Sequence, residues 1–155
     1  MNRSYNFAEE QSAPLVVSPV SYPDSSLPIQ NLPLIESCAD IHLSVGEVAG
    51  LFESHPDWPG VILTTHGQYV GMLTRRACSE FLGTFLATRF FSKVPIINFY
   101  EKFPASGLVL DGSTSIAVAV KAALKRDGAS IYDPIIVRLN KCHYSLLDMW
   151  VLLQA

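Results

Sequence analysis

Apolar runs separated by short polar turns recur in the chain. Residues 60–74 align without a gap on residues 134–148, and each stretch reads apolar run, turn, apolar run. This match, which we call the hairpin alignment, places Val61 on Ile135, Ile62 on Ile136 and Met72 on Leu146. Self-similarity at one period indicates a supersecondary unit that is used twice. The sequence therefore predicts a domain built from two pseudo-repeats.

The first unit carries signals for a helix, a hairpin and a second helix. Ser44 and Glu47 have the spacing of a capping box, which predicts a helix over 45–53. The proline-rich stretch 55–60 ends it, and strands over 61–65 and 69–73 flank a turn in which Gly67 supplies a positive φ. From Arg75 onward, apolar residues recur every three or four positions, which indicates a long amphipathic helix. These residues are Cys78, Phe81, Leu82, Phe85, Leu86 and Phe90.

The second unit repeats this order. Prolines and aromatic residues in 93–107 indicate a crossover linker between the halves. The pattern then predicts a strand over 108–110, a helix over 114–126, strands over 134–139 and 143–147, and a final helix from Asp148. The predicted class is α/β (α+β), with two β-α-β-β-α repeats packed as a pseudo-twofold pair. The predicted repeats span 36–92 and 108–155.

Half of the ten prolines lie before residue 34. Because proline interrupts helices and the segment is rich in serine, residues 1–35 are predicted to form an extended or disordered arm. Two interpretations stay open. The arm is a plain linker, or it lies across the surface of the domain through Leu15, Val16, Leu32 and Leu34.

Composition excludes some functions. A net charge of −3 and a pI near 5.7 lack the basic footprint that nucleic acid requires. Only 16% of residues are charged and 49% are hydrophobic, so we expect an apolar surface that meets a partner or a second copy. Three cysteines without a CxxC pair favour a reducing compartment, hence the cytoplasm. No apolar run is long enough to predict membrane insertion, and the N-terminus lacks the apolar core of a secretory leader.

Candidate catalytic and metal-binding groups are sparse. The one close His/Cys pair, Cys142 and His143, sits on a predicted strand, where neighbouring side chains point to opposite faces. Cys78 lies on the apolar face of its helix, with no identifiable histidine partner, so core packing explains it better than nucleophilic catalysis. The sequence therefore predicts no metal site and no catalytic residue.

The β-α-β-β-α order, given twice, with VGMLT at 70–74 closing the first hairpin, resembles the tandem CBS-domain module, also called the Bateman module. The resemblance covers residues 36–155. More narrowly, PGVILTTHGQYVGMLTRRACSEFL and IYDPIIVRLNKCHYSLLDMWVLLQA are similar to the CBS-like N-terminal regions of bacterial signalling proteins that carry histidine kinase or diguanylate cyclase domains. The resemblance implies a non-enzymatic regulatory module. Such modules sense adenine nucleotides (AMP, ADP or ATP) between the repeats and control an attached or partner protein.

The family's ligand motif reads Gly, two apolar residues, Thr or Ser, two further residues, then Asp. A small residue admits the ligand, the hydroxyl meets phosphate at a helix N-terminus, and the carboxylate holds the ribose. The first copy keeps Gly71 and Thr74 but has Ala77 at the carboxylate position. The second copy has Asp148 at the hydroxyl position and Val151 at the carboxylate position. The resemblance thus implies at most a partial nucleotide site, which includes Gly71, Thr74 and Asp148.

Arg75 and Arg76 extend this candidate site. Both follow Thr74 at the start of a predicted helix, where a cation is unfavourable unless an anion lies nearby. Two interpretations stay open at these positions. The arginines hold a phosphate, or Thr74 is an ordinary helix cap and the arginines are solvated surface groups.

Residues at the start of each central strand are further candidates. Tyr132, Pro134 and Ile135 lie where CBS relatives often pack an adenine, and the tyrosine ring suits base stacking. Trp58 and Val61 are at the equivalent place in the first copy. The alternative at both places is that the aromatic ring packs in the interface between the repeats.

Two functions follow from these patterns. The first is a regulatory CBS-pair module that senses a small ligand, an adenine nucleotide by the resemblance, and controls a signalling effector. The alternative is a ligand-free dimerisation or protein-interaction module with a degenerate nucleotide site. A stripe of phenylalanines and few charges predict a homodimer in either case. Those phenylalanines are Phe81, Phe85, Phe90 and Phe91.

Overall fold

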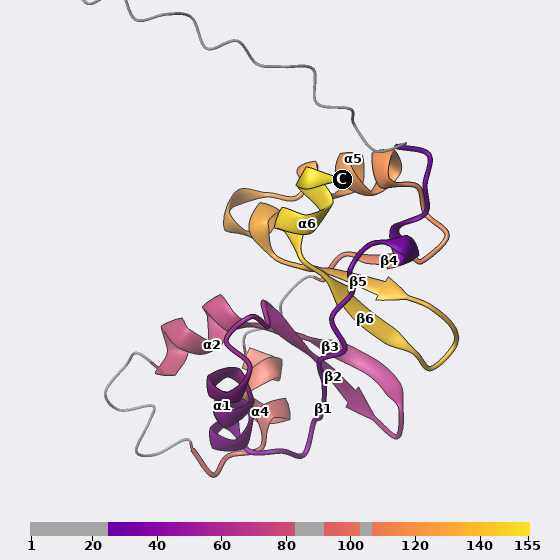
Figure 1. Cartoon of the computed structure of the whole chain (residues 1–155). Coiled ribbons are helices and arrows are strands. Elements are labelled where there is room, and N and C mark those ends of the chain that lie inside the picture. Colours follow the sequence, from indigo (N-terminus) through magenta and orange to yellow (C-terminus); the bar gives the residue numbers. More distant parts are fainter. Residues whose placement is uncertain (1–24, 83–91, 103–106) are drawn as a thin grey trace, which may run out of the picture.

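Two lobes make up the molecule, and each has a three-stranded sheet with helices on its outer face (Figure 1). The computed structural model describes residues 25–82, 92–102 and 107–155. We call the lobe built on strands β1 to β3 repeat 1 and the lobe built on β4 to β6 repeat 2. The predicted class, two β-α-β-β-α units packed as a pseudo-twofold pair, is confirmed.

Repeat 1 follows the predicted order. Its elements are β1 (Cys38–Asp40), α1 (Val45–Ser54), β2 (Gly60–Thr65), β3 (Gln68–Thr74) and α2 (Arg75–Leu82). Strand β2 lies in the middle, parallel to β1 and antiparallel to β3. The hairpin turns through Gly67 at φ 74°, as the sequence predicts. The later part of the predicted long helix, with Phe85, Phe90 and Phe91, lies outside the described residues.

The predicted capping box at the start of α1 is confirmed. The Ser44 hydroxyl accepts a hydrogen bond from the Glu47 backbone N–H, and the Glu47 carboxylate accepts one from the Ser44 backbone N–H at 2.8 Å. The Ser44 hydroxyl also donates to the Glu47 carboxylate, and the backbone and hydroxyl bonds from Ser44 hold the pKa of Glu47 below its ordinary value. Two backbone N–H groups at this helix end thereby gain partners.

Repeat 2 reproduces the topology. It contains β4 (Val109–Asp111), α5 (Ile116–Leu124), a 3-10 turn (Gly128–Tyr132), β5 (Ile135–Arg138), β6 (Tyr144–Leu147) and α6 (Met149–Gln154). Residues matched by the hairpin alignment also have equivalent cross-strand partners, because Ile62 pairs with Met72 and Ile136 pairs with Leu146. The internal repeat read from the sequence is therefore a structural repeat.

A helix that the sequence did not predict lies in the crossover. Residues 93–107 were predicted as a linker, yet α4 (Ile96–Lys102) forms there and buries Ile96 and Phe99 in the core of repeat 1. Pro95 directly precedes the helix, where the missing N–H of proline is no loss. The proline that suggested a linker instead marks a helix start.

A second internal repeat ties the lobes together. Residues 25–32 (SSLPIQNL) match residues 92–99 (SKVPIINF), and we call this match the crossover alignment. The first segment contains the 3-10 turn η1 (Ile29–Asn31) and packs on repeat 2, where Ile29 donates to the Thr114 carbonyl at 2.8 Å. The second packs on repeat 1, where Val45 donates to the Val94 carbonyl at 2.8 Å. The chain thus contributes to repeat 2 before it builds repeat 1.

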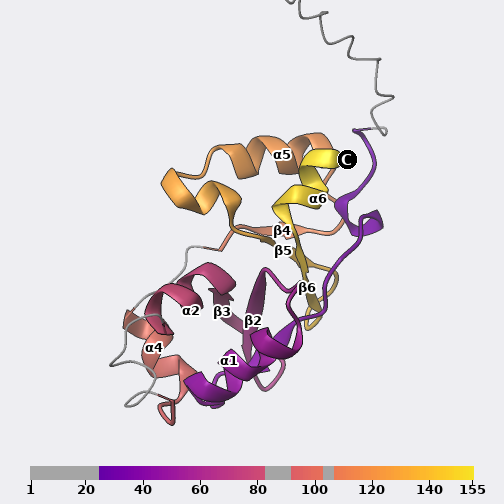
Figure 2. The ribbon, with the colours of Figure 1, turned by 60° about the vertical axis from the view of Figure 1, so that its left-hand side comes forward.

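Part of the predicted arm therefore belongs to a core. Ile29 is fully buried among the core residues of repeat 2, and Leu32 and Leu34 pack against the same cluster. The backbone of Ile35 then pairs with Leu146 on β6 before the chain enters β1. Figure 2 shows this indigo segment running along repeat 2 on its way to β1. Leu15 and Val16 lie outside the described residues.

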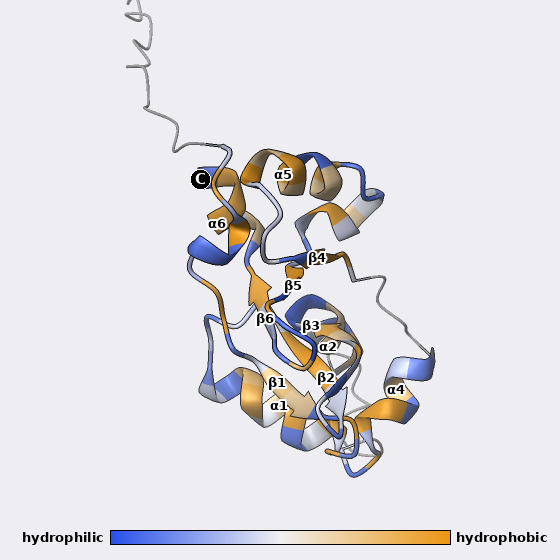
Figure 3. Cartoon of the chain, turned by 90° about the vertical axis from the view of Figure 1, so that its right-hand side faces the viewer, coloured by the Kyte–Doolittle hydropathy of each residue, from blue (hydrophilic) through white to orange (hydrophobic). Residues whose placement is uncertain are grey.

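The two sheets face each other through a small apolar layer. Ile62 and Met72 of repeat 1 meet Ile136 and Leu146 of repeat 2, and all four are fully buried. Strands β2, β5 and β6 accordingly carry the most hydrophobic colouring at the centre of the molecule (Figure 3). A Cβ atom on Gly60 would lie 3.4 Å from Pro134, its equivalent in repeat 2, so the pseudo-twofold axis passes between these residues.

Candidate functional site

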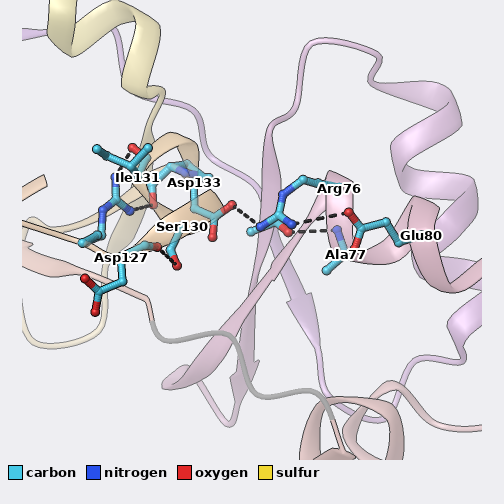
Figure 4. Close-up of polar contacts among 10 residues, drawn as sticks. Arg76, Ala77, Glu80, Asp127, Ser130, Ile131 and Asp133 are labelled. Atoms are coloured by element: carbon cyan, nitrogen blue, oxygen red, sulfur yellow. Dashed lines mark hydrogen bonds and ion pairs between the residues drawn. The ribbon is translucent and has the colours of Figure 1, made fainter. Parts of the chain in front are cut away.

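An ion pair joins the repeats beside the pseudo-twofold axis. Arg76, in the first turn of α2, donates to Asp133 at 3.2 Å, and Asp133 directly precedes Pro134 and β5. Figure 4 shows the guanidinium between Asp133 of repeat 2 and Glu80 of its own helix. The Arg76–Glu80 contact is 3.4 Å. Among the described residues, Glu36 and His143 also make a contact between the lobes, at 3.3 Å, but neither of them occupies a motif position.

Arg76 remains accessible although it is paired. Its side chain is 47% exposed, whereas that of Asp133 is only 14% exposed. The hydrogen bond to Asp133 is the main cause that raises the pKa of Arg76 above its ordinary value, and Glu80 adds to it. An accessible guanidinium with weakly held partners can exchange a carboxylate for another anion.

Thr74 is a helix cap. It is 3% exposed, and its hydroxyl accepts a hydrogen bond from the Ala77 backbone N–H at 3.1 Å. This bond satisfies one of the N–H groups that α2 leaves unpaired at its start. The capping interpretation of Thr74 is therefore confirmed, and a phosphate contact at its hydroxyl stays a prediction.

Arg75 points away from the inter-repeat axis. Its guanidinium donates to the backbone carbonyls of Trp58 at 2.7 Å, Phe52 at 3.0 Å and His55, and it lies over the Phe52 ring. These bonds close the loop between α1 and β2. Arg75 thus has a structural role. The sequence placed Arg75 and Arg76 at one anion site, but their guanidiniums bind different partners.

Gly71 makes room for a side chain of this protein. A Cβ atom at Gly71 would lie 2.2 Å from the Tyr100 ring of α4. The small residue at this motif position therefore lets α4 approach β3. Tyr69, two residues earlier, packs its ring against Tyr144 with centroids 5.4 Å apart, and burial raises the pKa of Tyr69 to about 12. Aromatic packing thus dominates this part of the sheets.

The second copy of the motif is also used structurally. Asp148 is the N-cap of α6, since its carboxylate accepts from the Trp150 backbone N–H at 2.6 Å. Arg126 donates to the carbonyls of Ala123, Ile131 and Pro134 and lies 3.7 Å from the Met149 sulfur. Loss of hydration through burial lowers the pKa of Arg126.

The residues at the strand starts separate into two groups. Val61 and Ile135 are fully buried, in the cores of repeat 1 and repeat 2 respectively. Trp58 stacks on His55, with ring centroids 3.9 Å apart. Tyr132, in contrast, is 78% exposed beside Asp133, so its ring is accessible from solvent.

The structure therefore brings together part of the predicted site. Arg76 and Pro134 lie near the axis between the repeats, together with Asp133, which the sequence did not single out, and exposed Tyr132 directly precedes Asp133. Arg75, Thr74 and Asp148 hold loops and helix ends. The available signal for Asp133 was its position directly before Pro134, at the start of the second central strand.

The described residues contain no group of three His, Cys, Asp or Glu side chains placed to hold a metal ion. Burial raises the pKa of the Cys78 thiol to about 11, which suits a packing role. Among the helices that the structure describes, none is both long and apolar enough to cross a bilayer.

Similarity to known proteins is confined to the fold. No protein-family model matches the sequence, and no curated protein matches it. The CBS domains of a transcriptional regulator from Streptococcus pneumoniae superimpose with a TM-score of 0.60 at 15% identity, covering 83% of this chain and 98% of that one. An acetoin utilization protein (AcuB) from Vibrio cholerae gives 0.62 at 8% identity, covering 82% and 87%.

A third solved structure, CBSX2 in complex with AMP, gives a TM-score of 0.50 at 15% identity, covering 83% of this chain and 89% of that one. At these identities the likeness establishes the architecture. The chain has the fold of a tandem CBS-domain module, as the sequence resemblance implied.

Proposed function

We propose that this protein is a non-enzymatic regulatory module of the CBS-pair type, which senses an adenine nucleotide between its repeats and controls an attached or partner signalling protein in the cytoplasm. The observation that supports the proposal is the Arg76–Asp133 ion pair, which links the two lobes beside their pseudo-twofold axis. The AMP complex of a neighbour with the same fold supports the choice of ligand class.

The proposed signal is an exchange of anions at Arg76. A nucleotide phosphate competes with Asp133 for the accessible guanidinium, and Tyr132 is available to stack a base. When a phosphate displaces Asp133 from Arg76, the contact between the lobes is lost. Ligand binding then favours one arrangement of the repeats over another, which is the requirement for transmitting a signal. A histidine kinase or diguanylate cyclase domain is the proposed effector.

The fit to a nucleotide is incomplete. A phosphate can bind Arg76. However, the motif's ribose-binding carboxylate is replaced by Ala77 in repeat 1 and by Val151 in repeat 2. We therefore expect the phosphate and the base to provide the binding energy, with little discrimination at the ribose.

Thermal unfolding with ATP, ADP, AMP, S-adenosylmethionine and cyclic dinucleotides tests the proposal. A ligand present at a hundredfold excess over its Kd stabilises the folded state by about 2.7 kcal/mol, which raises the Tm of a chain of this size by about 5 to 10 °C. We expect such a rise with an adenine nucleotide. If none of these compounds raises the Tm, the sensing proposal is wrong.

A specific observation favours a second function, a dimerisation or protein-interaction module. Large apolar side chains on the helices of repeat 2 are exposed, and Trp150 reaches 68%. The others are Val118, Leu124 and Leu153. Exposed residues of this kind mark interfaces. Sedimentation at several concentrations should show a homodimer that Trp150→Ala with Leu153→Ala weakens, and a monomer at all concentrations would contradict self-association.

A further inference from the structure

A pocket of about 360 Å³ lies in repeat 2, between the segment 25–32 and α6. Its walls include Leu27, Leu32, Ile116, Val151 and Ala155. Figure 2 shows the C-terminal end of α6 beside the indigo segment that contains η1. The volume falls within the range of about 300 to 1,000 Å³ that is typical of small-molecule sites.

The internal repeats show what fills the same place in repeat 1. The crossover alignment places Leu32 on Phe99, and the hairpin alignment, continued into the following helix, places Ala155 on Phe81. Phe81 and Phe99 pack ring against ring, with centroids 4.4 Å apart and planes inclined by 57°. The crossover alignment is structural, because the N–H of Asn31 donates to Pro28 and that of Asn98 to Pro95, each at 3.1 Å.

The α6 side of the pocket also lacks an aromatic ring. Val151, which replaces Ala77, is larger in repeat 2 but carries no ring. Among the residues that the structure describes, repeat 1 therefore fills this space with aromatic rings of its own, and repeat 2 places no ring in the corresponding space. The same fold therefore has room for aromatic rings at this place, as Phe81 and Phe99 show in repeat 1.

The lining of the pocket favours an uncharged occupant. The lining side chains carry no charge, and the polar ones are the amides of Asn31 and Gln154. A phosphate or carboxylate would lose hydration here without gaining an ionic partner. An uncharged molecule with one hydrogen-bonding group suits the apolar walls and the two amides.

We propose that this pocket binds a small neutral aromatic molecule, of the size and chemistry of indole or a substituted phenol, in the place that Phe81 and Phe99 occupy in repeat 1. The pocket is a separate site from the Arg76–Asp133 axis. The proposal does not depend on nucleotide sensing.

Indole is the probe for the test, with binding followed by the methyl NMR signals of Leu32, Ile116 and Val151 in the complete chain. We expect saturable shifts of these signals, with a Kd on the order of 0.1 to 1 mM for so small a ligand. Leu32→Phe restores one ring of the repeat 1 arrangement. It should raise the Tm without ligand and weaken indole binding at least tenfold.

Lys121→Phe is the matched control, because it adds a ring at an exposed position of α5 outside the pocket. Its affinity for indole should equal that of the unmodified protein. AMP should not displace indole, since the two sites differ. The proposal is overturned if indole causes no saturable shifts, if AMP competes with it, or if a folded Leu32→Phe protein binds indole as well as the unmodified protein does.

Discussion

Both repeats hold the loop between their first helix and their central strand with a guanidinium, but the arginine comes from different places. In repeat 1 it is Arg75, in the first turn of α2, and in repeat 2 it is Arg126, which follows α5. Met149, the positional equivalent of Arg75, contacts Arg126 at 3.7 Å. Each guanidinium donates to three backbone carbonyls at the loop and its borders.

This difference shows what the fold requires. The carbonyls of a tightly turned loop need donors, because an unpaired buried carbonyl is costly. The guanidinium can come from the start of the helix after the hairpin, as with Arg75, or from the end of the helix before the loop, as with Arg126. A charged residue at a motif position is therefore weak support for a ligand contact until its partners are known, and Arg75 illustrates the risk.

The largest expected loss of stability tests the two segments of the crossover alignment, 25–32 and 92–99. Ile29→Ala removes a fully buried side chain from repeat 2, and Ile96→Ala removes its equivalent from repeat 1. Each should lower the free energy of unfolding by about 2 to 5 kcal/mol. Urea denaturation measures both, with exposed Lys121→Ala as the control. A loss below about 1 kcal/mol for Ile29→Ala would show that residues 25–35 do not belong to the core.

The paired guanidiniums allow a direct comparison. Arg75→Ala should lower the free energy of unfolding by about 2 to 3 kcal/mol, because three carbonyls around the α1–β2 loop lose their donor. Arg126→Ala should cost less, about 1 to 2 kcal/mol, because its hydrogen bonds of 3.1 to 3.5 Å are longer.

Arg75→Lys serves as the control for charge alone, and it should recover little stability because an ammonium cannot span three carbonyls. If Arg75→Lys is as stable as the unmodified protein, the planar fork is not what closes the loop. Chemical denaturation of the variants measures this difference.

The Arg76–Asp133 pair should contribute little to stability. With the arginine side chain 47% exposed, Arg76→Ala should lower the free energy of unfolding by less than about 1 kcal/mol. Added salt should reduce even this difference, since accessible ion pairs are screened. A large loss that persists in salt would mean that Arg76 is a structural residue like Arg75.

The smallest effect concerns the cysteines. Cys78 is buried and its pKa is raised to about 11, so little of its reactive thiolate forms at pH 8. Iodoacetamide labelling of the folded protein, followed by mass spectrometry, should modify exposed Cys142 well before Cys78. Rapid labelling of Cys78 in folded protein would contradict its place in the core of repeat 1.

The sequence predicted the elements that rest on local patterns. The capping box at Ser44, the hairpin turn at Gly67 and the equivalence of the two hairpins follow from short-range chemistry and from the hairpin alignment. It did not predict α4, and it left the packing of Leu32 and Leu34 on the domain as one of two open interpretations. Prolines at 28 and 95 suggested linkers, although SSLPIQNL and SKVPIINF were visible as a second repeat.

The candidate site was predictable only in part. Position along the chain identified Arg76 and Tyr132, but it could not show which guanidinium faces the other repeat. That choice depends on tertiary contacts, namely Asp133 for Arg76 and the loop carbonyls for Arg75. The two partners of the ion pair are far apart in the sequence, so no local pattern contained it.

Calorimetric titration of AMP and ATP into the unmodified protein, Arg76→Ala and Asp133→Asn tests the proposed anion exchange most directly. Asp133→Asn removes the internal competitor and should bind the nucleotide more tightly than the unmodified protein. Arg76→Ala should bind it about tenfold more weakly or worse, because a charge-assisted hydrogen bond is lost. Equal affinities in all three folded proteins would contradict a nucleotide site at Arg76.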